Sequence, residues 1–187
     1  MSDFPLYTME TAPQESKPIL GELQKAFGFL PNIAGKMAIS PEMMTGFIGL
    51  FQNVHAGTFS EVEVQVLLLT DAVTNACTWA VAFHSFLGLK EGLSEDDVKA
   101  MRAGGVPKDP KLAALSMLAR KMIEKRGHVE ESVVDEFLAA GYEKRHVVEA
   151  IEAVAASTIT NYVCTITQPP LEEPFKAHAW KDLTAVG

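Results

Sequence analysis

The segment SEVEVQVLLLTDAVTNACTWAVAFH, residues 60–84, decides the fold class. Ser60 followed by Glu63 forms a capping box, in which each side chain satisfies a backbone N–H group at the start of a helix. Residues 62–73 are then apolar on nearly every side. Such a helix has no solvent face, so it must lie at the centre of a fold or against another subunit. We therefore predict a homo-oligomer.

The rest of the chain repeats the helical pattern. Apolar residues recur at three- and four-residue spacing, and Ser40-Pro41 and Asp109-Pro110 place a capping residue before a proline at a helix start. No strand-like alternation is bounded by a hairpin turn. The pattern predicts an all-α bundle of about seven to nine helices, in a single domain over residues 1–187 with its motif core at about 40–165. The expected helices are 14–27, 41–56, 60–74, 76–90, 95–103, 110–126, 130–140, 144–165 and 174–181.

The charge and the cysteine count restrict the function classes. The net charge of the 187-residue chain is −8 and no basic run occurs, so neither nucleic acid nor an acidic membrane is an expected partner. The first 30 residues have no basic start and no long apolar run, so we expect no signal peptide. Two cysteines cannot form a disulfide framework, and a reducing, cytoplasmic setting is the expectation.

The chemistry is expected around Cys77. Asn75 is a good N-cap, which would place Cys77 at the second position of a new helix, where unpaired amides and the helix dipole lower a thiol pKa. His84 lies two turns further on the same face, about 10 Å along the axis, so the two side chains cannot touch. Ala80 lies between them and brings no chemistry. The alternative is a buried cysteine that acts as a small hydrophobe and a histidine satisfied in the core.

The run Asn75-x-Cys77-x-Trp79-Ala80-x-x-x-His84 resembles the signature of the alkylhydroperoxidase-like, carboxymuconolactone decarboxylase superfamily, called AhpD-like. Its redox branch carries Asn-x-Cys-x-(Tyr/His)-Cys-x-x-x-His at the start of a helix. The resemblance covers about 150 residues in the right order, which is specific for fold. It extends to residues 28–32, 40–41, 58–60, 88–94, 144–163 and 170–172. It implies an all-α domain that assembles as dimers, trimers or hexamers.

The resemblance also implies a weakened site. In the redox branch the second motif cysteine attacks the peroxide and the first one resolves it, and here these positions hold Ala80 and Cys77. The branch places a proton-relay glutamate twelve residues before the first cysteine, where this chain has Gln65. An amide cannot shuttle a proton. Glu61 lies one turn from Gln65 on the same face, but it could substitute only if the helix were shifted.

Three functions stay open. The first is a peroxidase-related oxidoreductase that reduces alkyl hydroperoxides through Cys77, weakly or with its activity lost, with an external thiol as reductant and His84 acting through water. The second is a non-redox enzyme of the decarboxylase type acting on a small lactone or acid, with His84 as general acid or base beside Gln65 or Trp79. The third is a ligand-binding protein without turnover, with a pocket of Trp79, Ala80 and Phe83.

Other sites are not expected. Cys164 lies on another helix, and a disulfide with Cys77 would require Cα atoms within about 7 Å, which two unrelated positions seldom satisfy. The other histidines make no metal-ligand spacing with a carboxylate, so no metal site is expected. No glycine-rich phosphate loop occurs, and we expect no cofactor. With nucleic acid and membranes not expected, the expected binding partner is a small-molecule substrate.

Overall fold

The computed structural model describes residues 4–181, and this part of the chain contains helices and loops but no strand. The predicted all-α class is confirmed. The elements in chain order are η1 (Gln14–Ser16), α1 (Lys17–Phe27), α2 (Asn32–Met37), α3 (Pro41–Ala56), α4 (Glu61–Thr74), α5 (Thr78–Glu91), α6 (Glu95–Arg102), α7 (Pro110–Glu124), α8 (Glu131–Ala139), α9 (Lys144–Thr167) and η2 (Glu173–His178), where η denotes a 3-10 helix.

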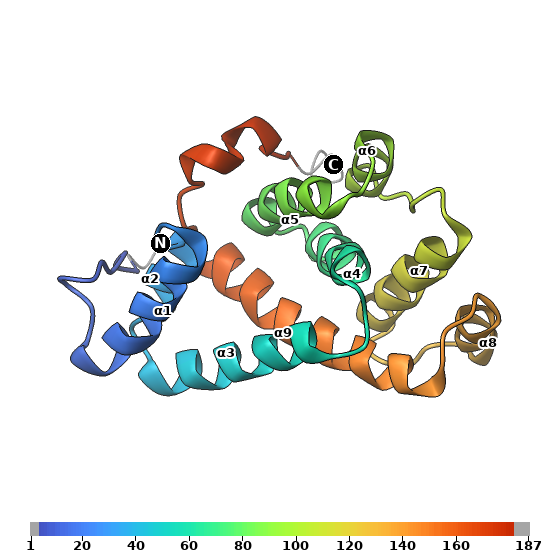
Figure 1. The fold of residues 1–187 in the computed structure, drawn as a ribbon, viewed down its shortest axis with the longest axis horizontal. Helices are drawn as coiled ribbons and strands as arrows, with labels where there is room; N and C mark the ends of the chain where they lie inside the picture. The colour runs from blue at the N-terminus through green and yellow to red at the C-terminus, as the bar shows by residue number, and fades with distance from the viewer. Residues whose placement is uncertain (1–3, 182–187) are drawn as a thin grey trace.

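Helices α4 and α5 form the centre of the molecule, and α9 runs across both of them (Figure 1). Residues 64–72 of α4 are all buried, because α4 packs against α5 on one side and against α7 and α9 on others. One chain therefore accounts for the apolar composition of α4 without a second subunit. The homo-oligomer stays a prediction.

The expected helix starts are present. Ser60 accepts a hydrogen bond from the Glu63 amide (3.3 Å), and the Glu63 carboxylate accepts one from the Ser60 amide (2.9 Å), which completes the capping box of α4. Ser40 and Asp109 cap α3 and α7, each with a proline at the first helical position. Substitution of such a cap by alanine costs about 1 kcal/mol. The starts of these three helices are thus determined locally.

The long helix α9 has one apolar side that faces outward. The side chains of Val148, Ile151, Tyr162 and Ile166 are each more than half exposed, whereas Ala150, Ala153 and Ala156 on the opposite side are fully buried. Alanines at the buried positions let α9 approach α4 and α5 closely. None of the helices within residues 4–181 combines the length and the apolar character that a membrane crossing requires.

Candidate thiol and histidine sites

The connection between α4 and α5 fixes the position of Cys77 through backbone hydrogen bonds. The Cys77 amide donates to the Ala72 carbonyl (2.9 Å) and the Ala76 amide donates to the Val73 carbonyl (3.1 Å). This is the Schellman pattern that ends a helix, with Ala76 at the left-handed position (φ 52°) that glycine usually occupies. The backbone then turns directly into α5, and the Val81 amide donates to the Cys77 carbonyl (2.9 Å).

The expected cap of α5 was wrong by two residues. Asn75 ends α4 as its C-cap, and Cys77 is itself the N-cap of α5. Because the Schellman turn consumes Asn75 and Ala76, α5 begins only at Thr78. Cys77 nevertheless lies at a helix start, where backbone N–H groups are free to face its sulfur.

The Cys77 thiol is buried, with 1% of the residue exposed, and its pKa is lowered. The neighbouring Cys164 thiol is the largest cause, and its effect exceeds that of burial, which raises the pKa. The backbone N–H groups of Ala80 and Trp79, in the first turn of α5, lower the pKa further. The thiolate of Cys77 is therefore favoured.

The sequence did not decide whether Cys164 approaches Cys77, and the structure places both residues at one cavity. α9 packs against α5, and its last turns pass the start of α5, so that both thiols line one cavity of about 150 Å³. Both cysteines are buried and free. Burial raises the pKa of the Cys164 thiol, and the neighbouring Cys77 raises it further. The two thiols are thus unequal.

His84 and Gln65 form a second site. The His84 Nδ1 atom lies 3.0 Å from the Gln65 Oε1 atom, and both residues are almost fully buried. Burial lowers the pKa of His84 to about 3, with a smaller contribution from the charge of His55. The imidazole is neutral at physiological pH, Nδ1–H donates to the amide oxygen, and Nε2 keeps a free lone pair.

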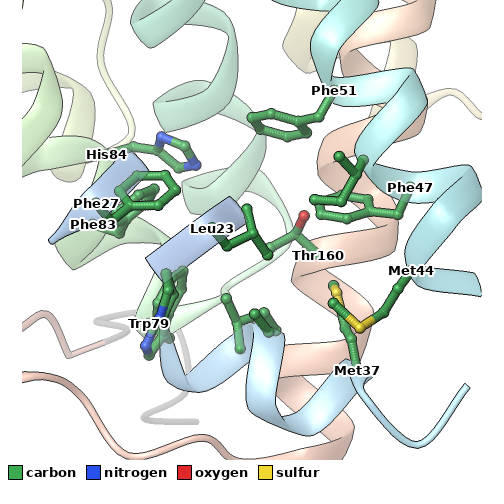
Figure 2. A pocket seen from close by; sticks show the side chains of 14 residues that line it. Leu23, Phe27, Met37, Met44, Phe47, Phe51, Trp79, Phe83, His84 and Thr160 are labelled. Carbon is green, nitrogen blue, oxygen red and sulfur yellow. The ribbon is translucent and has the colours of Figure 1, made fainter. Parts of the chain in front are cut away.

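His84 borders an apolar pocket of about 90 Å³. Figure 2 shows Phe47 and Phe51 of α3 across this pocket from His84, Phe83 and Trp79 of α5. The Trp79 and Phe83 rings are stacked, with centroids 5.0 Å apart. The remaining lining residues are Leu23, Phe27, Pro31, Ile33, Ala34, Met37, Met44, Ile48 and Thr160. This wall suits a small apolar or aromatic molecule.

On another side His84 and Gln65 face a wider groove of about 600 Å³. Its rim carries His55 and Glu61, whose side chains are hydrogen-bonded at 3.1 Å. Glu61 therefore shares a groove with His84 in the observed register of α4, without a shifted helix. Gln65, not Glu61, is the residue that contacts the imidazole.

The two sites are separate. Within residues 4–181, no hydrogen bond joins His84 to Cys77, and the two side chains line different cavities. Trp79 lines both the thiol cavity and the apolar pocket, so this residue lies between them. Of the expected pocket residues, Trp79 and Phe83 line the apolar pocket, whereas Ala80 is fully buried and lines neither cavity.

Glu172 was not recognised as part of this region. Its Oε2 atom accepts a hydrogen bond from the Trp79 indole N–H (2.9 Å), and its Oε1 atom accepts one from the Asn32 amide (2.6 Å). The carboxylate thus holds the segment after α9 against α5 and α2. Glu172 lies in the segment 170–172 that the resemblance covers, but no local pattern indicates its contacts, because both partners are far away in the chain.

Solved structures share this architecture. No family model and no curated protein matches the sequence. A peroxidase-related protein from Ralstonia eutropha JMP134, described as an alkylhydroperoxidase AhpD core, superposes with a TM-score of 0.83 at 16% identity over 96% of this chain and 98% of its own. A peroxidase-related protein from Silicibacter sp. TM1040 gives 0.77 at 17% identity over 93% and 92%. The debrominase Bmp8, in a variant bound to 2,3,4-tribromopyrrole, gives 0.76 at 18% over 95% and 96%.

The fold and the sites define an all-helical protein with a buried thiol pair beside an aromatic-lined histidine pocket. The chain has the AhpD-like fold, and the resemblance found in the sequence is confirmed at that level.

Proposed function

We propose that this protein is an AhpD-like thiol oxidoreductase that reduces small hydroperoxides with Cys77 as the nucleophile. The observation that carries this proposal is the lowered pKa of the Cys77 thiol at the start of α5. A thiolate, not a thiol, attacks peroxide oxygen. The adjoining cavity of about 150 Å³ gives room for the peroxide group of a small substrate.

The reaction is a two-electron transfer. The Cys77 sulfur attacks the terminal peroxide oxygen and the O–O bond breaks, which leaves a sulfenic acid on Cys77 and releases the alcohol once the alkoxide takes a proton. Over the whole cycle two equivalents of an external thiol return Cys77 to the thiol, with water and a disulfide of the reductant as the net products. Ala80 and Gln65 bring neither a second motif thiol nor a relay carboxylate, so we expect slow turnover.

The test is steady-state turnover of cumene hydroperoxide with dithiothreitol, for the wild type and the Cys77→Ser and Ala80→Cys variants. Turnover by the wild type that is lost in Cys77→Ser supports the proposal. A wild type without turnover contradicts it. A gain in Ala80→Cys alone would then mean that the scaffold is intact and its redox chemistry absent. A reducing compartment such as the cytoplasm, which would keep both thiols reduced between turnovers, belongs to the same proposal.

A second candidate function is the binding of a small apolar molecule in the aromatic pocket, with the His84 Nε2 lone pair as a hydrogen-bond acceptor for a polar group of that molecule. The observation that favours it is the pair of a neutral histidine and a wall of aromatic rings. We expect benzene to raise the melting temperature on binding, and Phe47→Ala to weaken that binding, because Phe47 lines this pocket and not the wider groove. Phe86→Ala is the matched control, because the Phe86 ring packs on Phe175 and does not line the pocket. Equal binding by both variants would exclude this pocket.

A further inference from the structure

Two cysteines from distant parts of the chain meet at one end of the helical core. Cys77 precedes the first turn of α5, and Cys164 lies in the last turns of α9. Both side chains line the same cavity of about 150 Å³. The chain has two cysteines in all, so both of its thiols are at this place.

The surroundings make the two sulfurs unequal in reactivity. Cys77 lies at a helix start, where the N–H groups of Trp79 and Ala80 stabilise negative charge on its sulfur. Cys164 lies inside a helix whose N–H groups are already bonded, and Glu172 nearby adds negative charge. The thiolate is favoured on Cys77, while Cys164 keeps its proton.

We propose that Cys77 and Cys164 form a redox pair, in which Cys77 reacts with the oxidant and Cys164 resolves it by closing a disulfide between α5 and α9. The proposal rests on the proposed function for its oxidant. It differs from the motif that the sequence resembles, in which both cysteines lie on one helix turn. Here the position of the second motif cysteine holds Ala80, and the second thiol comes from another helix.

The two steps balance. In the first, the Cys77 thiol and the hydroperoxide give a Cys77 sulfenic acid and the alcohol. In the second, the Cys164 sulfur attacks the sulfenic sulfur, the S–O bond breaks, and the hydroxyl leaves with the Cys164 proton as water. One hydroperoxide thus takes two electrons from the pair, and an external dithiol returns both thiols by exchange.

Burial favours the second step over further oxidation. Cys77 is 1% exposed and Cys164 is 4% exposed, so a sulfenic acid on Cys77 would be enclosed with the other thiol as its neighbour. An external thiol must diffuse into the cavity to reach such a sulfur, whereas Cys164 already lines that cavity. Intramolecular resolution is therefore the faster path.

The experiment uses the reduced full-length chain and one equivalent of diamide, a two-electron thiol oxidant that is independent of peroxide chemistry. We expect free thiols to fall from two per chain to zero, and non-reducing peptide mass spectrometry to find the peptides of Cys77 and Cys164 joined. Cys77→Ser and Cys164→Ser are matched controls that each keep one thiol and form no such link. Two thiols remaining in the wild type, or only intermolecular dimers, would overturn the proposal.

A second arm separates this inference from the proposed function. One equivalent of cumene hydroperoxide replaces diamide, and dimedone traps sulfenic acid. We expect dimedone on Cys77 in Cys164→Ser and at least tenfold less of it in the wild type, where the disulfide forms instead. A disulfide with diamide but no reaction with the hydroperoxide means that the pair exists and the proposed peroxidase function fails. Equal dimedone labelling of both proteins means that Cys164 does not resolve Cys77.

Discussion

The buried neutral state of His84 has a measurable effect on stability. In the unfolded chain a histidine takes up a proton with a pKa near 6.5, whereas in the folded protein His84 does so only at about 3. Between these values the unfolded chain binds the proton and the folded protein does not. Stability is therefore complete above pH 6.5 and is lost as the pH falls through this window.

The magnitude follows from the two pKa values. Each pH unit inside the window costs about 1.4 kcal/mol, so between pH 7.5 and pH 5 the free energy of unfolding falls by about 2 kcal/mol from His84 alone. Urea denaturation at the two pH values, for the wild type and His84→Gln, measures this quantity. Other groups titrate as well, but they are common to both proteins and cancel in the difference.

We expect the wild type to lose about 2 kcal/mol more than His84→Gln over this interval. His128→Gln is the matched control, since His128 is exposed at the turn after α7 and its replacement should leave the wild-type pH dependence intact. An identical fall in the wild type and in His84→Gln would refute the reasoning, because it would mean that His84 is charged in the folded protein.

Three further outcomes follow from the geometry. Ala76→Gly should raise the free energy of unfolding by about 1 kcal/mol in urea denaturation, since it removes a side chain from a left-handed position. Ala113→Gly inside α7 is the control and should lower the free energy of unfolding by a similar amount. If both variants were less stable than the wild type, Ala76 would not be strained. At pH 7, iodoacetamide should modify Cys77 in Cys164→Ser faster than Cys164 in Cys77→Ser, as measured by peptide mass spectrometry. Equal rates would contradict the difference in pKa between the two thiols. Burial raises the pKa of Asp71, whose two carboxylate oxygens accept no hydrogen bond within residues 4–181, so its contribution to stability is present at acid pH and is lost as the pH rises. The free energy of unfolding that Asp71→Asn gains over the wild type should therefore grow from pH 5 to pH 8, and a constant gain would contradict a protonated Asp71.

Local signals in the sequence were sufficient for most of the helices. The spacing of apolar residues and the caps at Ser40, Ser60 and Asp109 are signals that act within one or two helical turns. The observed α3, α4 and α7 therefore begin within one residue of the predicted starts. The short helix α2 was missed, because six residues are too few to show a period. Its start at Asn32 is held instead by Glu172, which is distant in the chain.

The candidate sites depended on contacts that spacing does not encode. An asparagine can occupy the cap position at either end of a helix, so its type alone did not decide the role of Asn75. The left-handed conformation of Ala76 ends α4 there and makes Asn75 its C-cap. The meeting of Cys77 and Cys164 results from the path of α9 across α5, which is a tertiary property. Gln65 was found by counting along the motif, and its contact with His84 needs only that α4 and α5 lie side by side.

The Schellman turn at Ala76 also has a consequence for how this site can vary between related proteins. Cys77 is positioned by the amide and carbonyl groups of Ala72, Val73 and Val81, and none of these bonds depends on a side chain. Replacements at positions such as 65 or 80 can therefore change the chemistry of the site without moving its sulfur. Such a backbone can keep Cys77 in place while the residue that supplies the second thiol changes. In the redox pair that we propose, Cys164 of another helix supplies the thiol that Ala80 lacks.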